Sequence, residues 1–378
     1  MRYNRRKFIK NTVSGTIGIT CTSILQSFAR ERNLRNNKTL VKKAVAILED
    51  GCSLAIPYWM IDSGKRGPSL VLIAAQHGNE VQGAEVARRF QKLCSEQLIA
   101  GKVWLIPMAN LPAIRKRRHS FDLGPEENNR LNPHKLHNMQ RHWPGNPEGN
   151  DTGRIAWSLY QSIFRHCSHV VDLHCWEHVK AAETLVYYDH EPSRIMGDVT
   201  TTRFISSSPV PEVKSNTLML RRLMVEKGNG AITIELSGQY QIQELQVQTG
   251  LSSMINIAKR LGMIQGEPEL SGKHIERRSD NSHEVVASCS GIFMPGFSEE
   301  KGRILVPEDN VIKGQMLGHI INEIDLKKEI VHAPVNGYLW QFGVCHWALC
   351  DASLPAQHPY VEAGGRLALI ITVEDDFH

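Results

Sequence analysis

A short polar motif between an apolar run and a helical pattern constrains the fold of this chain more than any other feature. Residues 70–75 form a continuous apolar run that is typical of a buried strand. Apolar residues then recur at roughly helical spacing from Val81 to Leu93. Between the two patterns lie His77 and Glu80, so both side chains sit at the end of a strand, where open α/β sheets place their functional sites.

His77 and Glu80 form the local half of a metal site built from two histidines and one carboxylate. Residues 170–173 read as a second strand, and His174 at its end supplies the third ligand. Three protein ligands leave the fourth position of a zinc ion open for water or substrate, as catalytic sites require. The sequence therefore predicts a metallohydrolase. Because the chain contains 17 histidines, a chance pairing of histidine and glutamate is the alternative explanation.

Further motifs accompany these segments in a fixed order. They lie at residues 67–68, 107–110, 141–145 and 233–236. In this order they resemble the succinylglutamate desuccinylase/aspartoacylase family, relatives of the zinc carboxypeptidases, over most of the mature chain. The resemblance implies an α/β fold with a mixed central sheet flanked by helices. It also implies one zinc ion bound by His77, Glu80 and His174, with Glu235 as the general base.

The arginine motif of the family fits this chain best at two short segments. Arg-Leu-Asn-Pro occupies residues 130–133, and Gln-Arg-His-Trp-Pro-Gly occupies residues 140–145. On this fit, Arg130 resembles the arginine that polarises the scissile carbonyl. Gln140 and Arg141 resemble the pair that binds a substrate carboxylate, a task that suits the planar fork of arginine. Solvated loop charges are the alternative for both arginines.

A rival fit takes Arg130 and the asparagine before it as the carboxylate-binding pair, and Arg118 as the polarising arginine. The first fit is preferred because it also explains Trp-Pro-Gly at residues 143–145. In that fit Lys135 and Asn138 stand where the family usually has acids. We therefore expect the substrate pocket to be loosened or re-aimed.

Glu235 suits the role of base on chemical grounds as well. Residues 231–236 form a β-prone run, so the carboxylate lies near the carboxyl end of a third strand. Zinc lowers the pKa of a bound water from about 16 to about 7, and a neighbouring carboxylate can take that proton and deliver it to the leaving amine. A surface glutamate on an edge strand is the alternative, although an acid within an apolar run is usually paired or functional.

The amino terminus resembles a twin-arginine export signal. Arg5 and Arg6 precede a mildly apolar stretch at residues 12–25, and small residues before and at Ala29 suit cleavage after that position. Residues 1–29 are therefore predicted to be a signal peptide, and the mature enzyme to be periplasmic or otherwise extracytoplasmic. The stretch is short and rich in Gly, Ser and Thr, so no stable membrane anchor is expected.

The composition changes at residues 265–283, a polar segment that reads as a linker. It separates a predicted catalytic domain, residues 30–264, from short strands at residues 284–378. The latter resemble the small lipoyl/biotinyl-like β-barrel that ends several family members. True carriers modify a lysine in a Met-Lys hairpin, whereas Lys327 and Lys328 follow Leu326, so a structural barrel at the active-site mouth is predicted.

The charge and cysteine content favour small-molecule chemistry. A net charge of +5 partly reflects the leader and is too diffuse for a nucleic-acid partner, which would need a concentrated basic stripe. The eight cysteines show no zinc-ribbon or redox spacing. The main hypothesis is a zinc-dependent deacylase acting on the amide, or an ester, of a small carboxylate. A metallocarboxypeptidase and an exported metal-binding protein without turnover are the alternatives, and an open cleft would favour peptides.

Overall fold

The computed structural model describes residues 37–120, 137–211, 218–270, 272–345 and 358–373. The predicted signal peptide at residues 1–29 and the predicted polarising residue Arg130 lie outside these ranges. Within the described residues, no helix is long and apolar enough to cross a membrane.

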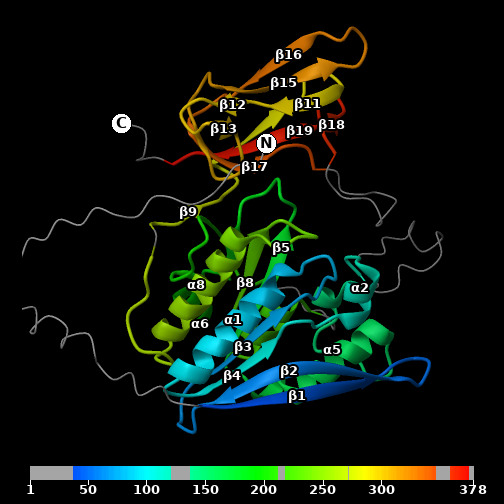
Figure 1. Ribbon diagram of the computed structural model, residues 1–378, viewed down its shortest axis with the longest axis vertical. Helices are drawn as coiled ribbons and strands as arrows, with labels where there is room; N and C mark the ends of the chain where they lie inside the picture. The colour runs from blue at the N-terminus through cyan, green and yellow to red at the C-terminus, as the bar shows by residue number, and fades with distance from the viewer. Residues whose placement is uncertain (1–36, 121–136, 212–217, 271, 346–357, 374–378) are drawn as a thin grey trace, which may run out of the picture. The chain divides into compact units, whose positions relative to one another are not determined.

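A nine-stranded mixed sheet forms the centre of the fold, with the strand order β1-β2-β4-β3-β5-β8-β6-β7-β9 (Figure 1). The strands are β1 (Lys38–Ile47), β2 (Ser53–Asp62), β3 (Ser69–Ala74), β4 (Lys102–Ile106), β5 (His169–Trp176), β6 (Glu183–Tyr187), β7 (Phe204–Ser208), β8 (Gly230–Ser237) and β9 (Ile275–Glu276). Strands β4, β3, β5 and β8 are parallel, whereas β1, β2 and β6 join through antiparallel pairs. The predicted mixed sheet is therefore confirmed.

Helices cover both faces of this sheet, so its central strands are buried on both sides, as parallel strands usually are. The helices are α1 (Gln82–Gln97), α2 (Leu111–Lys116), α5 (Asp151–Ser162), α6 (Glu191–Gly197), α7 (Leu220–Glu226) and α8 (Glu244–Arg260), with 3₁₀ turns η1 (Met139–Arg141) and η2 (Phe164–His166). The apolar faces of α5 and α7 pack on one side, and those of α1 and α8 pack on the other. The strand and helix predicted on either side of His77 are β3 and α1.

Short antiparallel strands make up the C-terminal part. They are β10 (Ser282–Val286), β11 (Gly291–Pro295), β12 (Phe297–Ser298), β13 (Arg303–Ile304), β14 (Asn310–Val311), β15 (Met316–Asn322), β16 (Lys328–His332), β17 (Gly337–Phe342), β18 (Tyr360–Val361) and β19 (Arg366–Ile371). They form two four-stranded sheets and a two-stranded one around a separate apolar cluster. Strand β9, in the predicted linker, pairs with β7 of the central sheet. The exact domain limits remain a prediction.

Strand β17 joins the C-terminal sheets to the central one. Its Trp340 meets Trp176 edge to face, with ring centroids 6.0 Å apart. The guanidinium of Arg277 lies 4.4 Å from the Trp340 ring and makes an ion pair of 2.8 Å with buried Glu183 on β6. The backbone of Ala181 also donates to the Trp340 carbonyl at 2.8 Å. These contacts fix the C-terminal strands beside the loop that follows β5.

Asp309 holds together the loop between β13 and β14. Its carboxylate is buried and accepts hydrogen bonds from Arg303, Lys301 and the Val306 amide, each at 2.8 or 2.9 Å. Burial alone would raise the pKa of Asp309, but these donors outweigh it and hold the pKa below its usual value. The carboxylate therefore stabilises the folded state when it is ionised.

Replacing this carboxylate tests its contribution. Asp309→Asn is expected to lower the free energy of unfolding by about 2 kcal/mol at pH 7, because it weakens charged hydrogen bonds in a buried site. The pKa of Asp309 is lower in the folded state than in the unfolded state. The difference in free energy of unfolding between wild type and Asp309→Asn should therefore be largest above about pH 4, and should shrink as the pH falls through the folded-state pKa. Urea unfolding at several pH values measures this.

The matched control is Asp325→Asn, which removes an exposed carboxylate paired with Lys327 in a surface turn. We expect a much smaller change there, because solvent screens such a pair. An equal loss in both variants, or a pH-independent loss in Asp309→Asn, would contradict this role.

Candidate metal centre

Three side chains that the sequence placed in one metal site come together in the structure. His77, Glu80 and His174 each offer one ligand atom, and these atoms all lie within 4.8 Å of one another. Their exposed fractions are 4%, 4% and 1%. His77 and Glu80 occupy the turn between β3 and α1, whereas His174 lies on β5. Because β3 and β5 are neighbouring parallel strands, their carboxyl ends meet at the same edge of the sheet.

Both imidazoles turn the same nitrogen toward Glu80. The Nδ1 atoms of His77 and His174 each lie 2.8 Å from one oxygen of the Glu80 carboxylate. The Nε2 atom of His77 donates to Asn138 Oδ1 at 2.9 Å, and that of His174 donates to Asp172 Oδ1 at 3.0 Å. Metal-binding histidines usually give their second nitrogen to such an acceptor, which fixes the ring and its tautomer. The residues therefore fit a metal ion held by two Nδ1 atoms and one carboxylate.

The charges of this cluster support the same interpretation. Burial alone would raise the pKa of Glu80, but His77 and His174 outweigh it and hold the pKa well below its usual range. Burial lowers the pKa of His174, whereas Asp172 and Glu80 raise it and prevail. The cluster thus stabilises positive charge at its centre, and a metal ion there would replace the protons on the nitrogens.

A buried amide connects this cluster to the Trp-Pro-Gly motif. Gln76 donates from Nε2 to Asp172 at 2.6 Å and accepts at Oε1 from the Trp143 indole at 2.8 Å. Trp143 is fully buried and packs edge to face on Phe164. Trp143 and Gln76 therefore hold Asp172, which in turn holds the His174 ring.

Glu235 lies next to this cluster. It stands directly opposite His174 in the parallel pairing of β5 and β8, and its side chain is buried. Burial raises the pKa of Glu235 to about 8; His174 opposes the shift, and Glu80 and Asp172 add to it. A metal ion at the centre would lower this value, because it would favour the carboxylate. A group poised in this way can accept a proton and later release it.

The match between sequence and family model decides the family. The model of the succinylglutamate desuccinylase/aspartoacylase catalytic domain matches residues 66–261, which is more than half of the chain. The chain belongs to this family. One curated relative, N-alpha-acetyl-L-2,4-diaminobutyric acid deacetylase of Halomonas elongata, is 27% identical over 122 residues, 32% of each chain. The chain thus spans about a third of the length of that relative.

Solved structures of this family share the fold. A succinylglutamate desuccinylase/aspartoacylase from Rhodobacter sphaeroides superposes with a TM-score of 0.64 at 20% identity, covering 89% of this chain and 96% of the other. The product-bound ectoine utilization protein EutE (DoeB) from Ruegeria pomeroyi gives the same TM-score at 17% identity, covering 89% and 96%. The family catalytic domain therefore accounts for the central sheet, and makes the chain a member of a group of hydrolases.

The predicted substrate residues are only partly placed. Gln140 is half-buried and Arg141 is exposed in η1, next to the metal centre through Asn138. The rival candidate Arg118 is half-buried after α2 and acts electrostatically on Tyr240, as Glu80 also does. The substrate roles of these arginines, and of Arg130 outside the described residues, remain predictions.

Asn138 has a task that the motif comparison did not suggest. Its Oδ1 accepts from His77 and also caps η1 by accepting from the Gln140 amide at 3.1 Å. An uncharged acceptor at this place holds the candidate metal ligand His77, whereas the sequence had suggested only an effect on the arginines.

Arg221 on α7 is a buried cation near the candidate site that sequence reasoning missed. It is buried, and its guanidinium lies 4.4 Å from the Tyr187 ring. Burial lowers the pKa of Arg221, while Tyr187, Asp172 and Glu235 favour its charged form. Its Nε and Nη1 atoms have no hydrogen-bond partner among the described residues. In the sequence, Arg221 is visible only as one of two adjacent arginines in a short segment, and such pairs usually lie on the solvent-exposed face of a helix.

His119 is a second missed residue. Its ring stacks on His77, with centroids 3.6 Å apart and planes 21° apart. It therefore covers one face of a candidate ligand, which its place after a basic loop did not indicate.

Asn138 provides a test of how the His77 ring is held. Asn138→Ala is expected to weaken zinc binding about 10- to 100-fold, because the Nε2–H of His77 loses its acceptor. Asn138→Asp should restore binding, since it keeps an oxygen in place. Competition with a chromogenic chelator measures the affinity. Asn146→Ala, at an exposed asparagine nearby, is the control, and an unchanged affinity in Asn138→Ala would refute the role.

Proposed function

We propose that this chain is a zinc-dependent deacylase that hydrolyses the amide bond of an N-acyl amino acid or similar small carboxylate. The observation that carries the proposal is the convergence of His77, Glu80 and His174 beside buried Glu235. Two imidazole nitrogens and one carboxylate suit zinc better than calcium or magnesium, which prefer oxygen ligands. The deacetylase named among the relatives acts, by its name, on an N-acetylated amino acid, which supports the substrate class.

We assign a separate role in this reaction to each group of residues around the centre. When bound by His77, Glu80 and His174, zinc would supply a water of lowered pKa and an electrophile for the scissile carbonyl. Glu235, buried beside this centre, would accept a proton from the attacking water and pass it to the leaving amine. Asp172 and Asn138 hold the two histidine rings so that their Nδ1 atoms stay directed at Glu80.

Arg221 is the residue we assign to the substrate carboxylate. It is a buried cation near Asp172 and Glu235, and two of its nitrogens lack partners among the described residues. A buried guanidinium without a full set of acceptors gains most from a ligand that brings two oxygens. Arg141 and Arg130 are the further candidates that the family motif supplies.

Glu235→Gln tests the assignment of the base. The variant should keep its zinc, because it retains all three proposed ligands, while kcat on N-acetyl amino acids falls about 100-fold or more. Metal analysis and amine release by the mature chain measure the two quantities. Chelation should abolish activity, and zinc should restore it. Full activity of the variant would remove Glu235 as base, and no turnover by zinc-loaded wild type would refute the deacylase.

Arg221→Ala tests the carboxylate site, with Arg222→Ala on the same helix as the control. Arg222 is already paired with Glu226 at 2.8 Å, so its loss should leave kinetics nearly unchanged. Arg221→Ala should lower kcat/KM about 100-fold for N-acyl amino acids. The loss should be much smaller for their methyl esters, which lack the carboxylate. A similar loss on both substrate types would contradict the assignment.

A further inference from the structure

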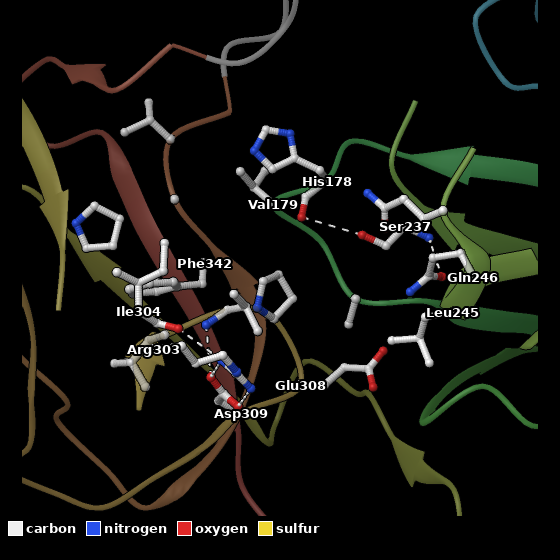
Figure 2. Close-up of a pocket in the computed structure, with 18 of the residues that line it drawn as sticks. His178, Val179, Ser237, Leu245, Gln246, Arg303, Ile304, Glu308, Asp309 and Phe342 are labelled. Atoms are coloured by element: carbon white, nitrogen blue, oxygen red, sulfur yellow. Dashed lines mark hydrogen bonds and ion pairs between the residues drawn. The ribbon is translucent and has the colours of Figure 1, made fainter. Parts of the chain in front are cut away.

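A large cavity lies beyond the metal centre, at the carboxyl ends of β5 and β8. Its volume is about 1330 Å³, which exceeds what an acetyl group needs. One wall comes from the segments that follow β5 and β8, and the other from the C-terminal strands. Figure 2 shows Ser237, Leu245 and Gln246 on one side, with Ile304 and Phe342 on the other.

The inner end of the cavity lies next to the proposed reaction site. Ser237 lines the cavity and follows Glu235 by two positions on β8, so strand alternation puts both side chains on the same face. Gln239 also lines the cavity, and its Nε2 donates to the Cys175 carbonyl at 2.9 Å and lies 3.4 Å from Glu80 Oε1. An occupant of the cavity therefore adjoins both the base and a metal ligand.

The inner wall is held in place by one buried side chain. Gln82, the first residue of α1, donates from Nε2 to the carbonyls of Ser237 at 2.6 Å and Gly238 at 2.7 Å. Its Oε1 accepts from the Gln243 amide at 3.0 Å. Gly238 has a φ of +95°, and a Cβ there would meet the side-chain nitrogens of Gln241 and Gln243. The wall is thus preformed, which lowers the cost of binding.

Three of the charged groups of the cavity are already paired with one another. Asp309 accepts from Arg303 and Lys301, and Glu308 lies in the field of Arg203. A charged ligand would have to compete with these pairs. The cavity therefore suits an uncharged occupant.

The remaining lining combines apolar side chains with amides. Val179, Leu245, Ile304 and Phe342 are apolar. Four glutamines also line the cavity, and all come from one segment of the catalytic part: Gln239, Gln241, Gln243 and Gln246. Gln239 and Gln246 already bond to the protein, to the Cys175 carbonyl and the Ser237 amide, whereas Gln241 and Gln243 face the cavity with their amides. A plain alkyl chain would strip water from these two amides without replacing its hydrogen bonds, which is unfavourable. A chain that carries its own amide groups can form hydrogen bonds with the glutamines and pack its carbon atoms against the apolar side chains.

We propose that this cavity binds the distal part of the acyl group, and that the preferred substrates are N-acyl amino acids whose acyl group is a long, uncharged, amide-bearing chain such as a short peptide. The inference rests on the amide hydrolysis proposed above. An amino acid acylated by a short peptide is itself a peptide with a free C-terminus, so this preference would make the reaction that of the metallocarboxypeptidase alternative at the same site. Arg221 holds the amino-acid carboxylate on the α7 side, and the acyl chain extends past Gln239 into the cavity.

A substrate series tests the length and the chemistry of the acyl group. The same amino acid is offered with an acetyl, a hexanoyl or an acetyl-alanyl-alanyl group. The zinc-loaded wild type should show a kcat/KM about tenfold or more higher for the last than for either of the others. Equal or better hydrolysis of the acetyl compound would overturn the proposal, and preference for hexanoyl would show an alkyl pocket instead.

Leu245→Trp tests the place of binding, because it fills the cavity from an exposed position in the first turn of α8. It should remove the advantage of the long substrate and leave hydrolysis of the acetyl substrate within about twofold. Ile324→Trp, at an exposed residue outside the cavity lining, is the control and should change neither. Retention of the advantage in Leu245→Trp would overturn the proposed location.

A binding measurement separates this inference from the proposed function. N-acetyl-dialanine methylamide carries no charge, and its affinity can be measured by calorimetry without turnover. Binding that Leu245→Trp abolishes and Ile324→Trp retains supports the cavity, even if no acyl amino acid is hydrolysed and the deacylase function fails. Absence of binding to the zinc-loaded wild type, with hydrolysis of the acetyl substrate intact, would overturn the inference alone.

Discussion

The carboxylate of Glu80 is the contact on which the candidate site depends. Its two oxygens meet the Nδ1 atoms of His77 and His174, which come from segments almost a hundred positions apart in the chain. Without that carboxylate, the Nδ1 atoms of two buried imidazoles would lack a partner, because their Nε2 atoms already bond to Asn138 and Asp172. Burying such groups is favourable only when each has a partner, so the geometry of all three side chains is mutually determined.

Parallel pairing of β3, β5 and β8 makes this contact possible. The register sets Ala74 beside Leu173 and sets His174 beside Glu235, so the candidate ligands and the proposed base emerge at one edge of the sheet. Those strands are mostly apolar along the rest of their length and are covered by helices on both faces. Hydrophobic burial thus fixes the positions, and the polar residues need only occupy the strand ends.

The sequence predicted the parts of this arrangement that are encoded locally. The run at residues 70–75, the helical spacing after it and the His-x-x-Glu spacing each lie within one segment, so periodicity and motif were sufficient. Asn138 and Arg221 could not be found in that way. Asn138 reaches His77 across 61 positions, and Arg221 is buried where α7 packs against β8 and Tyr187. Such contacts depend on how distant segments pack, and helix propensity or charge pattern does not contain that information.

Gln82 has a consequence for how the protein can change over evolutionary time. The residue opens the helix that immediately follows Glu80, and its amide group fixes the backbone that runs from Ser237 to Gln243. One side chain therefore ties the cavity wall to the helix that follows the candidate metal ligand Glu80. Mutations that enlarge or reshape the wall are constrained to preserve three hydrogen bonds to this single side chain. Under the proposed function, diversification of acyl preference is expected to occur through the opposite wall, because the hydrogen bonds of Gln82 among the described residues do not reach the C-terminal strands.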